Sequence, residues 1–349
     1  MVEPFRISSG EISEKDGIII SLRSEGLTGY GESSPMSGSF YSTDTPEKSW
    51  KELCEIVAPA IVGHSVAPAD LHALPAGNFT KTGVETALWD LAAQIQGEPL
   101  ARHLGGTKTE VQSGLAVGLY DSIPDMLRTI ETYLADGYRR VKIKIEPGRD
   151  IDLVRAVRNT FGDIPLYVDA NGAYSISDAA IFHALDDFNL MMFEQPFPGP
   201  ALEDLAQLQQ QVRTPVCLDE SLETAEDLRR AIALGSLRIA NFKIQRVGGF
   251  QRALEMYGIC REHGITAWVG TMPELGIGQA QGAALASLDG FVYPTDVEAS
   301  DRWFRDDIIE PWIRVRNGLI ELPTQAGLGY SINNAKVKRY SSASRTFQA

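Results

Sequence analysis

Charged residues recur at nearly constant intervals in the middle of the chain, each at the end of a short apolar run. The set consists of Lys144, Asp169, Glu194, Asp219 and Lys243, and its intervals are 25, 25, 25 and 24 residues. A single charge at such a position could simply face solvent beyond a strand. Five charges at one phase of a repeat are better explained by a shared site.

Three carboxylates flanked by lysines suit metal-assisted proton transfer. Converging carboxylates raise one another's pKa, and a bound hard cation relieves the repulsion. All-oxygen ligation suits Mg²⁺ or Mn²⁺ better than zinc. A lysine near a cation can have a depressed pKa and act as a base near neutrality. A cation on a substrate carboxylate stabilises the ene-diolate formed when the α-proton leaves, so the pattern predicts proton abstraction next to a carboxylate.

Short apolar runs alternate with amphipathic helical stretches from residue 111 onward. RRVKIKI precedes DLVRAVRNTFG, for example, and LRIANFKI precedes GFQRALEMYGICREHG. This alternation predicts seven or eight βα units and a parallel sheet. A doubly wound sheet usually carries a glycine fingerprint after its first strand, and none is present, so a closed barrel is favoured. A barrel gathers its strand C-termini, and hence these charges, around one mouth.

Residues 1–105 have a different pattern, with short strands first and helices after. TGVETALWDLAAQIQG repeats apolar residues at helical spacing and ends on glycine. A small α+β domain is therefore expected in front of the barrel.

Composition narrows the class of protein and its partners. Hydrophobic residues make up 44% and charged residues 22%, as in ordinary globular proteins. The net charge of −14 argues against nucleic acid. No apolar run reaches the roughly 18 residues of a membrane span, so no membrane association and a cytoplasmic location are expected. Three widely spaced cysteines predict neither disulfides nor a zinc site.

The order of the motifs resembles the enolase superfamily, in its muconate-lactonizing branch. GYGESSPMSGSFYSTDT is similar to that family's substrate-covering loop, VKIKIEPGRD to its K-x-K element, and NFKIQRVGG to its opposing lysine. YVDANGAY, FEQPF and CLDES resemble its metal-ligand motifs. The resemblance covers almost the whole chain.

The resemblance implies a (β/α)7β TIM-like barrel with an α+β capping domain built from the N-terminal region and the C-terminal tail. The expected parts are a capping domain at 1–105 with a covering loop at about 30–45, a barrel at 106–316, and a segment at 317–349 that returns to the capping domain.

The resemblance also assigns roles to individual residues. Asp169, Glu194 and Asp219 would bind Mg²⁺ or Mn²⁺, and Lys144 and Lys243 would be acid and base. Supporting roles fall to Lys142, Asn171 and Glu220. The expected substrate-binding residues are Met36, Phe40, Tyr41, Thr271, Met272, Glu274 and Ile277.

The last barrel segments are similar to those of o-succinylbenzoate synthases, which are often also N-succinylamino acid racemases. The motifs are AWVGTMPELGIGQAQGAALASLDGF and PTDVEASDRWFRDDIIEP. The implied activity is a lyase reaction, dehydration of 2-succinyl-6-hydroxy-2,4-cyclohexadiene-1-carboxylate in menaquinone biosynthesis. Alternatives in the same site are racemisation of N-acyl or N-succinylamino acids and dipeptide epimerisation, and a remote one is a non-catalytic carboxylate-binding relative. A small carboxylate substrate and a homo-oligomer are expected.

Two departures from the usual family motif concern the substrate. Thr271 stands for a glycine and Gln279 for an arginine. That arginine either holds nearby structure or serves a distal carboxylate, and in the second case restoring it should improve the use of succinylated substrates. The glycines at 276 and 278 either open a helix whose amides receive a substrate carboxylate or only shape a turn.

Overall fold

The computed structural model describes residues 1–38 and 40–349, so that Ser39, within the expected covering loop, lies outside the described residues. Two antiparallel hairpins open the chain. They are β1 (Phe5–Ile7) with β2 (Gly10–Ile12), and β3 (Ile18–Ser24) with β4 (Leu27–Ser33).

Helices follow the second hairpin, and the longest of them, α4, packs on it. They are α1 (Pro46–Glu52), the π-helical turn η1 (Leu53–Val57), α2 (Ala58–Ile61), α3 (Pro68–His72), α4 (Asn78–Gln96) and α5 (Leu100–His103). Helix α4 approaches β4 so closely that a Cβ on Gly31 would lie 1.9 Å from the carbonyl oxygen of Gly83. Glycine at this position therefore sets the distance between helix and hairpin.

Seven parallel strands form a curled sheet in sequential order. They are β6 (Leu115–Val117), β7 (Val141–Lys144), β8 (Leu166–Asp169), β9 (Phe193–Glu194), β10 (Val216–Leu218), β11 (Ile239–Phe242) and β12 (Thr266–Val269). Thr295 bridges the two edges of the curl, because its amide donates to Gln112 next to β6 and its hydroxyl donates to Val269 in β12. The expected TIM-like barrel behind an N-terminal cap is confirmed.

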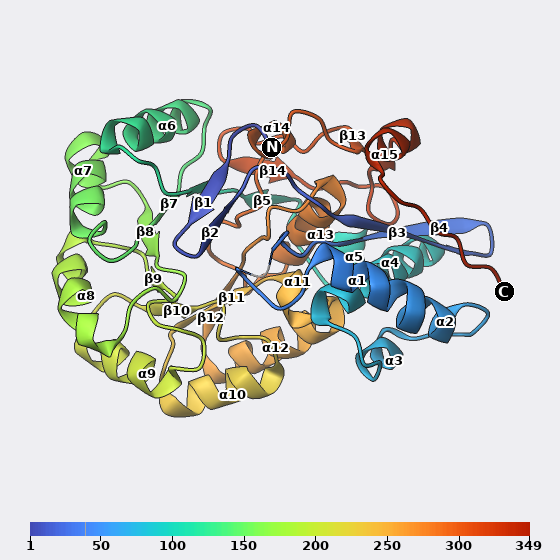
Figure 1. The fold of residues 1–349 in the computed structure, drawn as a ribbon, viewed down its shortest axis with the longest axis horizontal. Helices are drawn as coiled ribbons and strands as arrows, with labels where there is room; N and C mark the ends of the chain where they lie inside the picture. The colour runs from blue at the N-terminus through green and yellow to red at the C-terminus, as the bar shows by residue number, and fades with distance from the viewer. Residues whose placement is uncertain (39) are drawn as a thin grey trace.

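Helices connect successive strands on the outside of the sheet. They are α6 (Ile123–Ala135), α7 (Ile151–Phe161), η2 (Ile176–Asp178), α8 (Ala179–Leu185), η3 (Asp186–Phe188), α9 (Leu202–Gln211), α10 (Ala225–Leu234), α11 (Ile244–Val247), α12 (Phe250–His263) and α13 (Gly276–Ala286). Figure 1 shows α6 to α10 and α12 as an arc around the curled sheet. Most of the apolar core lies between this arc and the strands.

The C-terminal segment returns to earlier parts of the chain. Its elements are α14 (Ser300–Trp303), β13 (Ile309–Glu310), β14 (Leu319–Glu321), β15 (Ser331–Ile332) and α15 (Asn334–Tyr340). Strand β14 pairs antiparallel with β5 (Glu110–Gln112), and the amide of Leu328 donates to Asp90 in α4. These contacts agree with a tail that reaches the cap, and the domain boundaries stay a prediction. Within 1–38 and 40–349, no helix is both long and apolar enough to cross a membrane.

Candidate active site

The five charged residues that the sequence singled out lie in one layer at the C-terminal ends of five adjacent strands. Lys144, Asp169 and Glu194 end β7, β8 and β9, and Asp219 and Lys243 directly follow β10 and β11. The parallel register pairs Lys144 with Asp169, and Asp169 with Glu194. All five side chains are buried. The strand order places the three carboxylates between the two lysines.

Each lysine contacts the nearest carboxylate. Lys144 Nζ lies 2.5 Å from Asp169 Oδ2, and Lys243 Nζ lies 2.7 Å from Asp219 Oδ2. Burial lowers the pKa of Lys243, but Asp219 and Tyr41 outweigh it and raise that pKa above its ordinary value. The depressed lysine pKa expected from the sequence is therefore not found for Lys243 in this arrangement, because a carboxylate faces its ammonium group.

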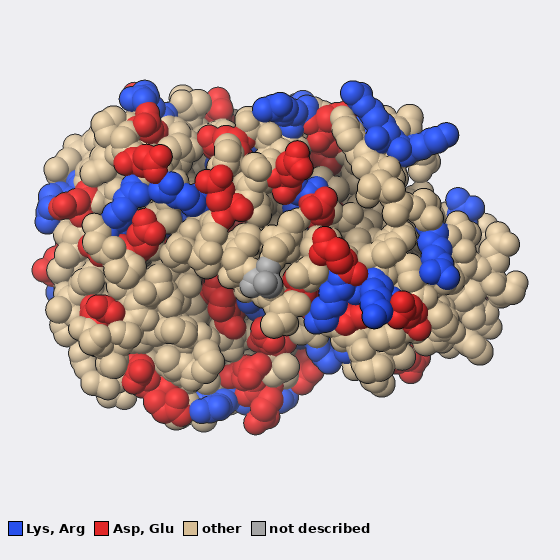
Figure 2. Space-filling model, viewed as in Figure 1, with Lys and Arg blue, Asp and Glu red and all other residues tan. Residues whose placement is uncertain are grey.

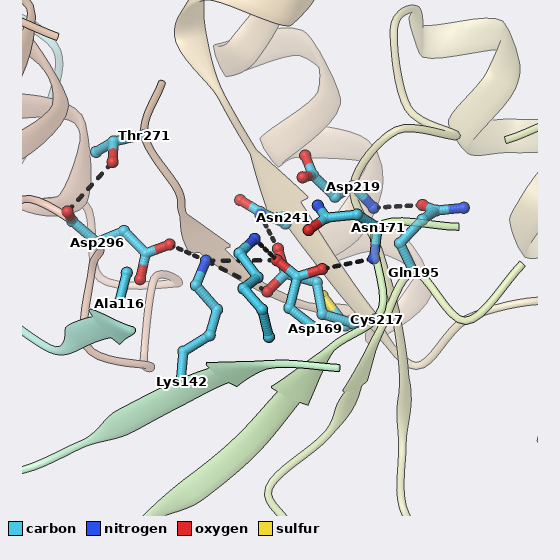
Figure 3. Close-up of polar contacts among 12 residues, drawn as sticks. Ala116, Lys142, Asp169, Asn171, Gln195, Cys217, Asp219, Asn241, Thr271 and Asp296 are labelled. Atoms are coloured by element: carbon cyan, nitrogen blue, oxygen red, sulfur yellow. Dashed lines mark hydrogen bonds and ion pairs between the residues drawn. The ribbon is translucent and has the colours of Figure 1, made fainter. Parts of the chain in front are cut away.

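Lys142 lies between two groups of acids, as Figure 3 shows. Its ammonium group donates to Asp296 and lies 3.5 Å from Glu194 Oε2 and 3.8 Å from Asp169 Oδ2. Arg140 Nη2 donates to the other oxygen of Asp296 at 2.8 Å. Burial lowers the pKa of Lys142, but these carboxylates, Asp296 foremost, hold it well above its ordinary value. Lys142 thus stays cationic between the acids.

The carboxylate oxygens fit a hard divalent cation in their chemistry. Glu194 Oε2 and both carboxylate oxygens of Asp219 are buried and accept no hydrogen bond from the described residues, although Lys243 and Arg246 lie within ion-pair distance of Asp219. Burial and the charge of Asp169 raise the pKa of Glu194 to about 8. For Asp219, burial is outweighed by Arg246 and Lys243, which lower its pKa to about 2. In the described part of the chain, no three acidic, histidine or cysteine side chains are gathered as a ligand set, since lysines and Arg246 face these oxygens.

Amide side chains hold the carboxylates in place. Asn171 has a left-handed backbone (φ 45°), which brings its own N–H to Asp169 Oδ1 at 2.9 Å. Its side-chain amide donates to Glu220 at 2.9 Å. Asn241, which the sequence reasoning did not identify, donates to Glu194 Oε1 at 2.8 Å. Asn241 lies two residues before Lys243 in the sequence, so strand alternation could have placed it on the same face.

A small cavity lies over this layer of charges. Its wall consists of Phe5, Ile7, Met36, Tyr41, Ala116, Lys142, Lys144, Asn171, Lys243, Thr271, Pro273, Asp296 and Trp303. Phe5 and Trp303 meet edge to face, with ring centroids 5.1 Å apart. The cavity therefore has a cationic floor and an apolar side.

Of the seven expected substrate-binding residues, Met36, Tyr41 and Thr271 line this cavity. The other four lie outside its wall. Phe40 packs against Gly10, and Met272 and Ile277 are fully buried in apolar clusters. Glu274 is buried and accepts a hydrogen bond from Gln279.

Tyr41 connects the covering loop to the lysine of β11. Its hydroxyl accepts hydrogen bonds from Lys243 Nζ at 2.8 Å and from Arg246. Both cations also lie over its ring, 5.2 and 5.0 Å from the centroid. Tyr41 was expected among the substrate-binding residues, and the structure adds a polar contact with the expected acid/base group Lys243.

The N-terminus of α13 is occupied by carboxylates of the protein itself. Glu32 accepts from the amides of Leu275 at 2.7 Å and Gly278 at 2.8 Å, and Asp307 accepts from the amide of Gly276 at 3.0 Å. A substrate carboxylate is therefore not the group bound there.

Gln279 bridges the side chain of Glu274 and the backbone of Glu298, and it lies outside the cavity wall. Its amide nitrogen donates to Glu274 at 3.1 Å, and its amide oxygen accepts from the backbone N–H of Glu298 at 3.2 Å. The Gln279 side chain is therefore turned into the protein, and the effect of an arginine here on succinylated substrates stays a prediction.

Comparison with known proteins agrees with the fold. The model of the mandelate racemase/muconate lactonizing enzyme N-terminal domain matches residues 1–105, and the enolase C-terminal domain-like model matches residues 125–336. These two domains together define the enolase superfamily architecture. The chain belongs to this superfamily and is one of its enzymes.

Individual relatives align over nearly the whole chain. An o-succinylbenzoate synthase of Geobacillus kaustophilus is 41% identical, over 99% of this chain and 93% of the relative. An N-succinylamino acid racemase of Amycolatopsis sp is 38% identical, over 94% of this chain and 91% of the relative. The crystal structure of a dipeptide epimerase from Enterococcus faecalis V583, complexed with Mg and L-Leu-L-Tyr, has a TM-score of 0.86 at 29% identity and covers 94% of this chain and 95% of its own.

Proposed function

We propose that this enzyme is an o-succinylbenzoate synthase. The observation that carries the proposal is the pair Lys144 and Lys243, which line one cavity from opposite sides of three buried carboxylates. The relative with the same activity, at 41% identity over 99% of the chain, supports it. The substrate would be a cyclohexadiene carboxylate with a succinyl side chain, and the product its aromatic dehydration product.

Asp169, Glu194 and Asp219 would hold Mg²⁺ or Mn²⁺. A divalent cation supplies Lewis-acid stabilisation of the negative charge that develops on the substrate carboxylate. Because the cation would compete with the lysines for these carboxylates, it would also weaken the ion pairs of Lys144 with Asp169 and of Lys243 with Asp219. The magnesium complex of the dipeptide epimerase supports this assignment.

The two lysines would act on the substrate from either side. In the synthase reaction, Lys144 removes the α-proton and returns a proton to the departing hydroxide, so that water leaves and the ring becomes aromatic. Lys243, held cationic, stabilises the charge that forms on the substrate. Lys142, paired with Asp296, keeps a positive charge below the carboxylates.

Racemisation of N-succinylamino acids is the second candidate for the same site. It needs an acid/base group on each face of the α-carbon, and Lys144 and Lys243 lie on opposite sides of the cavity. The racemase relative at 38% identity favours it. A cytoplasmic location and a homo-oligomeric state remain predictions.

Metal removal tests the proposal. Exhaustive chelation should abolish synthase turnover, and Mg²⁺ or Mn²⁺ should restore it, since the donor set contains only oxygen. Asp219→Asn should weaken metal binding, measured by calorimetry, far more than it lowers the melting temperature. Full synthase activity in the chelated enzyme would contradict the proposal, whereas metal-dependent racemisation without dehydration would favour the second candidate.

A further inference from the structure

The segment between β2 and β3 contacts the beginning of the covering loop through two adjacent side chains. Lys15 Nζ donates to the carbonyl oxygens of Ser34 at 3.0 Å and Pro35 at 2.9 Å. Asp16 Oδ2 accepts from the hydroxyl of Ser37 at 2.6 Å. Together they hold loop residues on both sides of Met36, the first loop residue in the cavity wall.

This segment follows directly on the β1–β2 hairpin, which is itself attached to the barrel. Phe5 and Ile7 of β1 line the cavity, and the carbonyl oxygen of Arg6 accepts from the amide of Leu119, which follows β6, at 2.8 Å. A Cβ on Gly118 would lie 2.9 Å from the same carbonyl oxygen, so glycine permits this close approach. The β1–β2 hairpin is thus a fixed support at the barrel mouth.

Acidic residues partly offset the cost of burying Lys15. Burial lowers the pKa of its ammonium group to about 8, and the charges of Glu32, Glu274 and Asp16 act against this shift. Glu32 in turn binds the N-terminus of α13, and Glu274 lies in the loop after β12. Lys15 therefore lies where the hairpin, the covering loop and the barrel loop meet.

We propose that Lys15 and Asp16 are positioning residues that hold the covering loop closed over the substrate. Lys15 fixes the two carbonyl groups at which the loop leaves β4, and Asp16 fixes Ser37. Met36, which lies between these fixed residues, is thereby kept at the cavity wall. The kinetic part of this inference rests on the proposed function, whereas the structural part does not.

Limited proteolysis measures loop closure without catalysis. Chymotrypsin can cleave the loop after Phe40 and Tyr41, and mass spectrometry identifies the cut. In Lys15→Met, cleavage at these two sites should be about tenfold faster than in the wild type, as expected for the loss of a charge-assisted hydrogen bond. The matched control is Lys51→Met, whose side chain is 72% exposed, and it should leave the rate unchanged.

Kinetics then separate positioning from general stability. Lys15→Met and Asp16→Asn should raise KM about tenfold and change kcat much less, since the loop binds the substrate rather than reacting with it. Lys15→Arg should restore most of the loss, because arginine can donate to the same carbonyls. If Lys15→Met does not fold, the test rests on the other two variants: KM should rise in Asp16→Asn and stay close to the wild-type value in Lys15→Arg.

Two results would overturn the inference. One is loop cleavage and KM in Lys15→Met equal to those of the wild type. The other is faster cleavage at aromatic sites throughout the chain together with a lower melting temperature, which indicates a purely structural role. If the synthase and racemase assays both fail, the proposed function fails, but the proteolysis comparison still tests whether Lys15 and Asp16 hold the covering loop. The two failures are therefore distinguishable.

Discussion

At the scale of single residues, the arrangement of lysines and carboxylates explains how a buried site can hold so many charges. Lys144 and Lys243 each face one acid, and Lys142 faces several. An unpaired buried charge is costly, so each cation offsets the desolvation of a neighbouring acid. The same pairing keeps the lysines close to the position of the substrate.

The division of labour between the lysines can be tested by substitution. Lys144→Ala and Lys243→Ala should each abolish racemisation, because each enantiomer needs both an acceptor and a donor of the proton. Exchange of the α-proton into deuterated solvent should survive for one enantiomer in each variant, measured by NMR. Synthase turnover should fall by roughly 10² to 10⁴ in either variant, as for general acid–base groups.

Lys51→Ala, at an exposed lysine, is the control for these variants. A Lys243→Ala enzyme with unchanged synthase and racemase rates would show that this lysine has no part in the chemistry.

Substitution of Gln279 tests whether this position determines substrate preference. Since its side chain bridges Glu274 and the backbone of Glu298, Gln279→Arg should leave the ratio of kcat/KM for N-succinyl and N-acetyl amino acids unchanged. Thr271→Gly is the comparison, because Thr271 does line the cavity and should change that ratio. A selective gain for succinylated substrates in Gln279→Arg would restore the interpretation made from sequence.

At the scale of elements, β4 and α13 are joined by one buried carboxylate. Glu32 lies near the end of β4. Its carboxylate accepts hydrogen bonds from the backbone amides of Leu275 and Gly278 at the N-terminus of α13, and a third from Ser34 Oγ at 2.8 Å. The positive end of the helix dipole favours a carboxylate there. This contact fastens the capping hairpin to the last βα unit of the barrel.

Glu32→Gln should therefore destabilise the protein. The amide group removes the negative charge and places a donor against a backbone N–H, at a cost of about 1–3 kcal/mol. Denaturant unfolding followed by circular dichroism measures the change in free energy. Glu47→Gln, at an exposed acid in the first turn of α1, should cost much less, and equal losses in the two variants would contradict the role of burial.

At the scale of the whole molecule, an acidic surplus coexists with mixed surface charge on the face that Figure 2 presents. The net charge is −14, and Figure 2 shows acidic and basic side chains interspersed on the face it presents. The pH dependence of stability consequently depends on individual buried groups. His72 at the end of α3 is one of them, because both of its ring nitrogens are buried and have no hydrogen-bond partner among the described residues.

Burial, with Arg252 and Lys81 nearby, lowers the pKa of His72 to about 4 from an ordinary value of about 6.5. Between these two pH values the unfolded chain binds a proton that the folded chain does not, so this histidine lowers stability as pH falls from about 6.5 to about 4. Above pH 6.5 it has no such effect.

In His72→Asn, urea unfolding at a series of pH values should show a smaller loss of stability over this window. His64→Asn, at an exposed histidine, is the control. An unchanged pH profile in His72→Asn would show that this residue keeps an ordinary pKa.

The sequence alone was enough to place the charged residues of the site in one layer, because their placement depends only on regularities within and between successive strands. Strand alternation and a repeat of about 25 residues are enough to place Lys144, Asp169, Glu194, Asp219 and Lys243 at the same end of neighbouring strands. The fold class followed from the same alternation of strands and helices. These features need only the period of the pattern and the geometry of a parallel sheet.

The tertiary structure decided the cavity wall and the groups that bind the helix N-terminus. Phe5 and Trp303 meet although about 300 residues separate them, and Glu32 reaches Gly278 across 246 residues. Gln279 turned away from the cavity because Glu274 and the backbone of Glu298 offered it hydrogen bonds. Such contacts depend on which distant segments the packed core brings together, and no local periodicity encodes them.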